Sequence, residues 1–169
     1  IRQYETRTRL PWSGLETSSS RRLIAPHGGR LVQRMLTSYD DQAIRSLPRL
    51  KVSELTLMDA KQIAMGSFSP LEGFIGREEL ESVLSKNRLN DGTVWPMPVL
   101  LQLPPGPFVQ HPEGETLGLT TGAPDSVEAL LHVQECFTYD LEKLAAGWFG
   151  TADTAHPGVK GLMSGSDRF

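Results

Sequence analysis

The most informative stretch of this chain is Ile63-Ala-Met-Gly-Ser-Phe-Ser-Pro-Leu-Glu-Gly-Phe-Ile75. A helix is predicted to end at Met65, because Gly66 readily adopts the left-handed conformation that stops a helix. Pro70 stiffens the loop that follows, and the last two residues of the stretch are apolar and are expected to enter the core. The stretch therefore reads as a helix, a rigid loop and a return into the interior.

The residues around this stretch favour short strands alternating with short helices. The clearest helix is 78–86, where Leu80, Val83 and Leu84 form one apolar stripe. Strands are predicted at 50–52, 94–103, 116–121 and 128–139, and also at 31–36, where the alternative is the first turn of a helix. Further helical segments are predicted at 40–46, 56–65, 159–163 and 140–146, the last continuing to Trp148 if Gly147 is tolerated. This mixture predicts an α+β fold, a small mixed β-barrel with flanking short helices.

Capping and turn residues refine these boundaries. Thr56 is expected to cap its helix, with Asp59 reaching back in a capping box. Asn87 is expected to end the 78–86 helix in the left-handed conformation. Asp140 is placed to cap the helix that follows it. Asn90-Asp91-Gly92 predicts a tight turn.

The charge of the chain is unevenly distributed. Its 169 residues, 38% hydrophobic and 22% charged, suit one globular domain. Residues 1–34 carry seven Arg against two Glu, a balance of +5, while the remainder carries ten basic against eighteen acidic residues, a balance of −8. We therefore predict a flexible basic arm at 1–22 and one domain at 23–169. The acidic body argues against nucleic acid as the principal partner.

Cysteine usage and hydropathy indicate the compartment. Cys136 is the sole cysteine and lies in an apolar run, so it is predicted to be a buried small hydrophobe in a reducing environment. No apolar stretch approaches the roughly 20 residues of a membrane span, and no secretory signal is recognisable. The expected location is the cytoplasm, without a membrane partner.

Self-contained catalytic motifs are not found in the sequence. It has no Gly-x4-Gly-Lys-Ser/Thr phosphate loop, no Gly-x-Gly-x-x-Gly fingerprint, no closely spaced histidine pair and no Gly-x-Ser-x-Gly elbow. His27 and His156 lie in glycine-containing loops and are candidates for ligand contact, the alternative being hydrogen bonds that pin the loops. The aromatic residues Trp95, Trp148 and Phe149 could stack on a base but fit a core better.

Four segments, in order, resemble the N-terminal domain of the ATP sulfurylase (sulfate adenylyltransferase) family. They are Pro26-His-Gly-Gly29, Ile63 to Ile75 as quoted above, Asn87-Arg-Leu-Asn-Asp-Gly-Thr-Val-Trp-Pro-Met-Pro98 and Phe149-Gly-Thr-Ala-Asp-Thr-Ala-His-Pro-Gly-Val-Lys160. The resemblance covers about residues 23 to 165. It implies a PUA-like fold for 23–169, followed in the family by a larger α/β domain that joins sulfate to the α-phosphate of ATP, releasing pyrophosphate.

The family's catalytic motifs belong to that second domain and do not occur in this chain. They are a Gln-x-Arg-Asn-Pro loop, a His-x-x-His motif and a Gly-Arg-Asp-His segment. The resemblance therefore implies no catalytic, cofactor-binding or metal-binding residue here, with ATP and sulfate as substrates of the full-length enzyme and the missing catalytic domain of the same polypeptide as partner. Joining two anions requires converging cations, and within the match only Arg88 and Lys160 are cations near loops.

The residues of the matching loops are candidates for loop or interdomain contacts. They are His27, Gly28, Gly29, Phe68, Ser69, Pro70, Arg88, His156 and Lys160. Two other interpretations remain open. One is a stand-alone PUA-like binding module, since such folds bind RNA elsewhere and the basic arm could contact phosphates. The other is an association domain that forms a homo-oligomer, since members of the family are commonly oligomeric.

Overall fold

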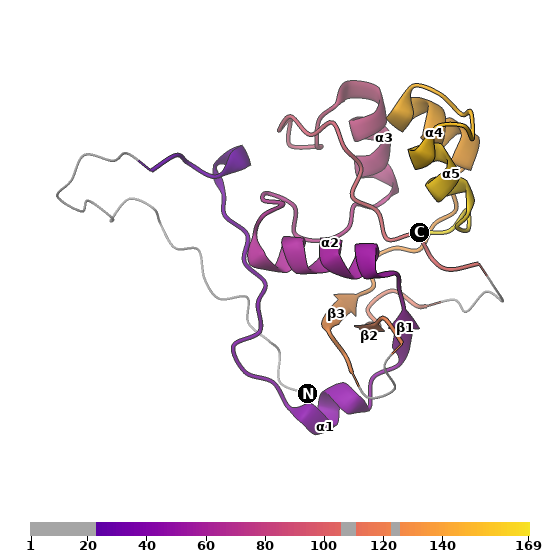
Figure 1. Ribbon diagram of the computed structural model, residues 1–169. Helices are drawn as coiled ribbons and strands as arrows, with labels where there is room; N and C mark the ends of the chain where they lie inside the picture. The colour runs from indigo at the N-terminus through magenta and orange to yellow at the C-terminus, as the bar shows by residue number, and fades with distance from the viewer. Residues whose placement is uncertain (1–22, 106–110, 123–125) are drawn as a thin grey trace.

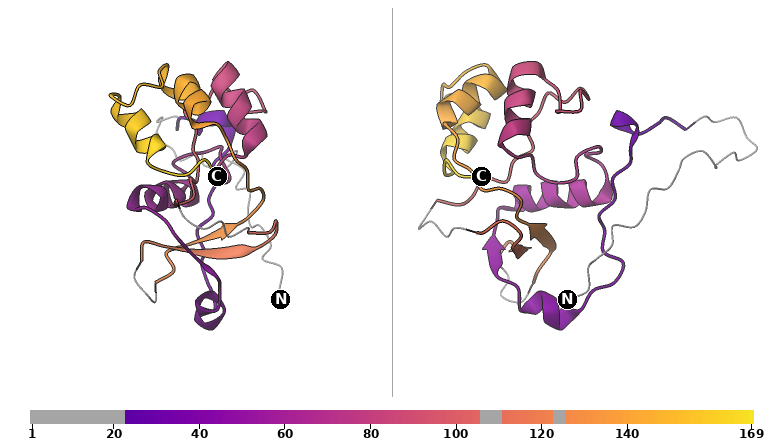
Figure 2. Two further views of the ribbon diagram at one scale, coloured as in Figure 1. Left: turned by 90° about the vertical axis from the view of Figure 1, so that its right-hand side faces the viewer. Right: turned by 180° about the vertical axis from the view of Figure 1, so that it is seen from behind.

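The computed structural model describes residues 23–105, 111–122 and 126–169 (Figure 1). The arm predicted at 1–22 lies outside the described residues. A small sheet lies on one side of helix α2 (Glu54–Met65), and a group of three helices lies on the other side (Figures 1 and 2). Each side has its own hydrophobic cluster, with Phe74 packed against both.

The sheet has three described strands in the order β1-β2-β3: β1 (Arg49–Lys51), β2 (Thr116–Thr120) and β3 (Ala129–His132). β1 runs parallel to β2, and β2 runs antiparallel to β3. Alternate residues Leu117 and Leu119 of β2 are 1% exposed and pack into the cluster beneath α2. The α+β class is thus confirmed, whereas the described strands form an open sheet and do not show a closed barrel.

Helix α2 begins earlier than the sequence suggested. Its cap is Ser53, whose Oγ accepts the N–H of Thr56 at 3.0 Å, so the prediction that Thr56 caps the helix is wrong. Both hydroxyl residues fit the local pattern, and the structure begins the helix at the earlier one. The predicted end is confirmed, since Gly66 has φ 89°.

The second group consists of α3 (Arg77–Lys86), α4 (Leu141–Phe149) and α5 (Pro157–Met163). Their facing side chains Leu80, Leu144 and Val159 are fully buried. Two predicted helix boundaries are confirmed. Asn87 ends α3 in the left-handed conformation with φ 54°, and Asp140 begins α4, its side chain accepting the N–H of Lys143 at 3.0 Å. A short helix α1 (Asp41–Arg45) and a 3-10 turn η2 (His27–Gly29) complete the elements.

Three predicted strands are wrong or shortened. Residues 31–36 are extended but do not join the sheet, because their backbone groups bond to the end of α2 and the loop after it: Arg34 N–H donates to Ala64 O at 2.8 Å. Residues 94–103 form no strand beyond an isolated bridge at Val94, since Pro96 and Pro98 have no N–H for a ladder. The strand predicted at 128–139 is shortened to β3.

Cys136 is exposed, which contradicts the prediction that it is buried. Its Sγ lies 3.7 Å from the carbonyl oxygen of His111, and partial burial of the thiol raises its pKa. The neighbouring Phe137 faces the core instead, at 8% exposed. None of the helices within the described ranges is long and apolar enough to span a membrane.

Candidate functional site

The strap, which we define as residues 26–34, crosses the loop that follows α2 (Figure 1). Val32 N–H donates to Ser69 Oγ at 2.9 Å, and Ser69 Oγ–H donates to Gly66 O at 2.6 Å. The Ser69 hydroxyl thus satisfies two backbone groups, the N–H of Val32 in the strap and the carbonyl of Gly66 at the end of α2. Because Ser69 is 5% exposed, this bond is shielded from water and fixes the strap on the loop.

An aromatic group lies at the tip of the strap. The Trp95 ring has its centroid 5.9 Å from that of His27 and meets Phe68 edge-on at 6.4 Å. His27 Nε2–H donates to Val94 O at 2.7 Å, which leaves Nδ1 as the acceptor of the neutral ring. Trp95 Nε1 is buried without a hydrogen-bond partner among the described residues. His27 therefore pins two loops together, which is the alternative the sequence left open for it.

The two glycines of the strap serve different needs. Gly28 has φ 68°, and a Cβ added there would lie 2.9 Å from Pro70 Cγ. Gly29 has φ 73°, but a Cβ there would meet nothing within 4 Å. Close approach to Pro70 therefore requires glycine at position 28, whereas position 29 requires it only for its backbone angle.

The cations near this group are engaged in local contacts. Arg30 forms an ion pair with Glu72, and Arg34 Nη1 donates to Glu72 O at 2.6 Å. Arg88 Nη1 donates to the Gly92 carbonyl at 2.8 Å and so closes its own turn. Since all three arginines are exposed, these contacts contribute to local order more than to stability.

Two of the sequence candidates lie elsewhere. His156 caps α5, with Nδ1 accepting the N–H of Val159 at 3.4 Å, and its ring lies 5.1 Å from Phe149. Lys160 is an exposed residue of α5. Figure 1 shows α5 on the side of the molecule away from the 3-10 turn of the strap. The structure therefore gathers seven candidates, the strap residues His27, Gly28 and Gly29 with Phe68, Ser69, Pro70 and Arg88, and separates His156 and Lys160 from them.

Trp95 and Glu72 belong to this group and were missed as site residues. Trp95 was interpreted as a core residue, and it does pack against the core while also contacting His27. Glu72 was part of the quoted stretch without a role. Neither shows a local signal, because their partners lie 68 and 42 residues away along the chain.

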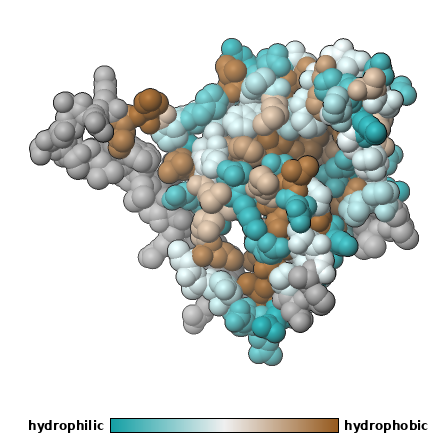
Figure 3. All heavy atoms as spheres, viewed as in Figure 1, coloured by the Kyte–Doolittle hydropathy of each residue, from teal (hydrophilic) through white to brown (hydrophobic). Residues whose placement is uncertain are grey.

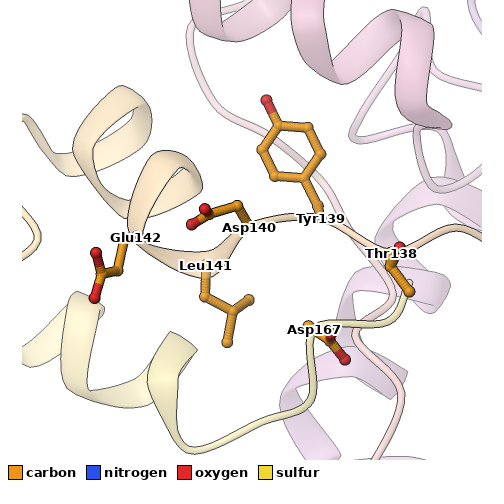
Figure 4. Close-up of a pocket in the computed structure, with 6 residues that line it drawn as sticks. All are labelled: Thr138, Tyr139, Asp140, Leu141, Glu142 and Asp167. Carbon is orange, nitrogen blue, oxygen red and sulfur yellow. The ribbon is translucent and has the colours of Figure 1, made fainter.

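One hollow of the described surface, beside the start of α4, is acidic. It has a volume of about 460 Å³ and is lined by Thr138, Tyr139, Asp140, Leu141, Glu142 and Asp167. Figure 4 shows its three carboxylates around Leu141. Their negative charge disfavours sulfate and nucleotide phosphates.

Tyr139 connects this hollow to α3. Its hydroxyl donates to Glu81 Oε1 at 2.8 Å, and Lys143 Nζ donates to the same oxygen at 3.0 Å. The hydrogen bond from Lys143, followed by that from Tyr139, lowers the pKa of Glu81, and burial raises the pKa of the Tyr139 phenol. The arrangement joins α3 to α4 and keeps Glu81 ionised.

A second hollow, of about 370 Å³, lies between the start of the described chain and the loop after α2. It is lined by Leu23, Ile24, Pro26, His27, Leu31, Gly66, Ser67 and Ser69, which makes it mainly apolar. Across the described ranges, no three His, Cys, Asp or Glu side chains are grouped so as to hold a metal ion. The apolar lining of this hollow suits packing against another apolar surface.

The chain belongs to the PUA-like domain family, whose model matches residues 24–169. It is similar to proteins named sulfate adenylyltransferase. That of Cenarchaeum symbiosum (strain A) is 37% identical over 145 residues, covering 86% of this chain and 37% of the relative. That of Synechococcus sp. (strain JA-3-3Ab) is 40% identical over 143 residues, covering 82% of this chain and 36% of the relative. That of Pyrococcus abyssi (strain GE5 / Orsay) is 35% identical over 143 residues and covers the same shares of the two chains.

The chain thus spans little more than a third of the length of these relatives. Among solved structures, the hexameric APS kinase from Thiobacillus denitrificans is similar over 57% of this chain and 20% of its own, with 31% identity and a TM-score of 0.47.

Proposed function

We propose that this chain is the N-terminal domain of a sulfate adenylyltransferase, the enzyme that joins ATP and sulfate into adenosine 5′-phosphosulfate and pyrophosphate. One observation carries the proposal: sequence identity of 35–40% over more than four fifths of this chain with relatives that bear this name. The matching segment makes up 36–37% of each relative, so the proposed enzyme has a further part of nearly two thirds of its length.

In this proposal the domain scaffolds and orients the catalytic part and does not turn over substrate by itself. Contact between sulfate and an ATP phosphate must be stabilised by converging cations and amide donors. The hollow beside the start of α4 instead presents Asp140, Glu142 and Asp167, and Arg88 is directed to its own turn. ATP and sulfate are accordingly proposed as substrates of the whole polypeptide, bound outside this domain.

The nine candidate residues are proposed as loop and interdomain contacts. The group around Trp95 sets the conformation of the strap, and His156 with Lys160 forms a separate contact on α5. The proposal has three further parts. The protein forms a homo-oligomer, it acts in the cytoplasm, and extended segments outside the three strands complete a PUA-like barrel. One such segment pairs Phe137 with Phe169 through hydrogen bonds of 3.0 and 2.9 Å.

The gene beyond the codon for Phe169 tests the proposal. We expect an in-frame continuation that encodes the Gln-x-Arg-Asn-Pro, His-x-x-His and Gly-Arg-Asp-His motifs. The long protein should release pyrophosphate from ATP and sulfate, and the 169-residue chain should release none. Turnover by the 169-residue chain alone would overturn the scaffolding role. An RNA gel shift by this chain that is lost on deleting residues 1–22, with no turnover by any longer product, would favour the RNA-binding alternative.

A further inference from the structure

The exposed large apolar side chains of the described residues are concentrated in one part of the chain. Eleven are exposed by more than a third: Leu23, Ile24, Leu31, Met35, Leu36, Tyr39, Leu55, Met58, Met65, Val94 and Met97. Nine of them precede Gly66, and the two others are Val94, whose carbonyl accepts a hydrogen bond from His27, and Met97. The described residues from 98 to the end of the chain contribute none of the eleven, although they supply much of both cores.

Helix α2 carries an apolar stripe on its outer face. Leu55, Met58 and Met65 are 72%, 53% and 48% exposed, and their spacing places them on one side of a helix with 3.6 residues per turn. Leu57 and Ile63 lie on the opposite side and are 4% and 5% exposed. The helix is therefore apolar on two faces, of which the core uses one.

The strap and the residues after it extend this stripe beyond the C-terminal end of α2. Arg34 N–H donates to Ala64 O at 2.8 Å, and Leu31 Cδ1 lies 3.0 Å from the position a Cβ of Gly66 would occupy. We name the combined set the apolar surface: Leu31, Met35, Leu36, Leu55, Met58 and Met65. Figure 3 shows apolar patches over α2 interrupted by hydrophilic groups.

The composition of the apolar surface is that of a protein interface. Three of its six residues are methionines, which are enriched at interfaces because the flexible side chain adapts to its partner. Its edges are polar and paired, with Arg30 bound to Glu72 beside the strap and Lys61 bound to Glu128 at 2.8 Å beside α2. Apolar side chains bordered by paired polar groups, as here, are typical of a packed contact.

We propose that the catalytic part of the same polypeptide packs against the apolar surface. This inference rests on the proposed function. The relatives supply the occupant, because their matched segment is 36–38% of a much longer chain. RNA is disfavoured as the occupant, since none of the six residues is basic and phosphate contacts need Lys or Arg. The contact also gives the strap a role, because the strap places Leu31 beside Gly66 at the C-terminal end of α2.

Thiol labelling of single-cysteine variants tests the contact. The background is Cys136→Ser. In it, Met58→Cys places a thiol on the apolar surface, and Glu142→Cys places one at an exposed position of α4 as the matched control. Both thiols should react readily with a maleimide in the 169-residue chain. In the long protein, labelling at position 58 should slow at least about tenfold, whereas labelling at position 142 should change less than about twofold.

The outcomes separate this inference from the proposed function. If the long protein produces adenosine 5′-phosphosulfate but position 58 reacts as fast as in the 169-residue chain, the docking surface is overturned and the function stands. If no continuation with the catalytic motifs exists, both are overturned. If position 58 is already protected in the 169-residue chain, and light scattering shows a dimer, a second copy is the occupant and the inference fails.

Discussion

Gly28 approaches Pro70 so closely that a Cβ on the glycine would lie 2.9 Å from Cγ of the proline ring. The two residues are 42 positions apart and join the strap to the loop after α2. Gly28 also has φ 68°, which side chains rarely adopt. Contact and backbone angle together make this the least substitutable point of the strap.

Gly28→Ala should therefore destabilise the chain more than Gly29→Ala. At position 28, backbone strain of about 1–2 kcal/mol adds to overpacking of about 1–3 kcal/mol. At position 29 only the strain applies, because nothing lies within 4 Å of an added Cβ. Urea unfolding of both variants measures the difference, and equal losses would show that Pro70 does not restrict the site.

Ser69→Ala should lower the free energy of unfolding by about 1–3 kcal/mol, since the buried N–H of Val32 would lose its acceptor. Ser67→Ala, at an exposed position of the same loop, is the control and should stay within about 0.5 kcal/mol of the parent. Hydrogen exchange should show faster exchange of the Val32 amide in the first variant. An unchanged Val32 amide would mean that the strap is held by other contacts.

Glu81→Gln should reduce the melting temperature at neutral pH and lose this effect in acid. Hydrogen bonds from Lys143 and Tyr139 lower the folded-state pKa of Glu81 below its ordinary value of 4.5. The stabilisation is therefore present above about pH 4.5 and is lost as the pH falls through the lowered folded-state value.

The effect should be small, because both side chains of the pair are exposed to solvent, which screens their interaction. Thermal melts across this range measure it, and Glu113→Gln, in an exposed turn, is the control. A difference between Glu81→Gln and the parent that persists unchanged in acid would contradict the assignment.

Cys136 should react with an alkylating reagent in the folded protein, because it is exposed. The reaction should be slower at neutral pH than in guanidinium chloride, since partial burial raises the pKa of the thiol and the thiolate is the nucleophile. Mass spectrometry over a pH series measures both rates, with Cys136→Ser as the blank. If Cys136 reacted only after unfolding, its exposure in the structure would be contradicted and the burial predicted from the sequence would be supported.

Much of the local structure was predictable because its causes are local. Gly66 ends α2, Asn87 ends α3 and Asp140 begins α4, each through groups within four residues. The error at Thr56 has a related origin, because Ser53 is an equally suitable cap three residues earlier. The strand predicted at 31–36 was wrong for a different reason. A short apolar segment does not show whether its backbone N–H groups will bond to a neighbouring strand or, as Val32 does, to a serine hydroxyl.

The candidate site was predicted in part. Seven residues chosen from matching loops do lie together, whereas His156 and Lys160 lie on another side of the molecule. The sequence could not indicate that Trp95 and Glu72 join the group. Nor could it show that Cys136 faces outward while Phe137 turns into the core, since both belong to one apolar run.

The amino-acid sequence alone determined the ends of α2 and α3, the start of α4, the acidic character of the body and the resemblance to a family, because each depends on neighbouring residues or on composition. The folded chain decided which loops meet, which face of α2 is exposed and that the single thiol, of Cys136, reaches solvent. Those features arise from contacts such as His27 with Val94, 67 residues apart, and only the three-dimensional path of the backbone brings such groups within bonding distance.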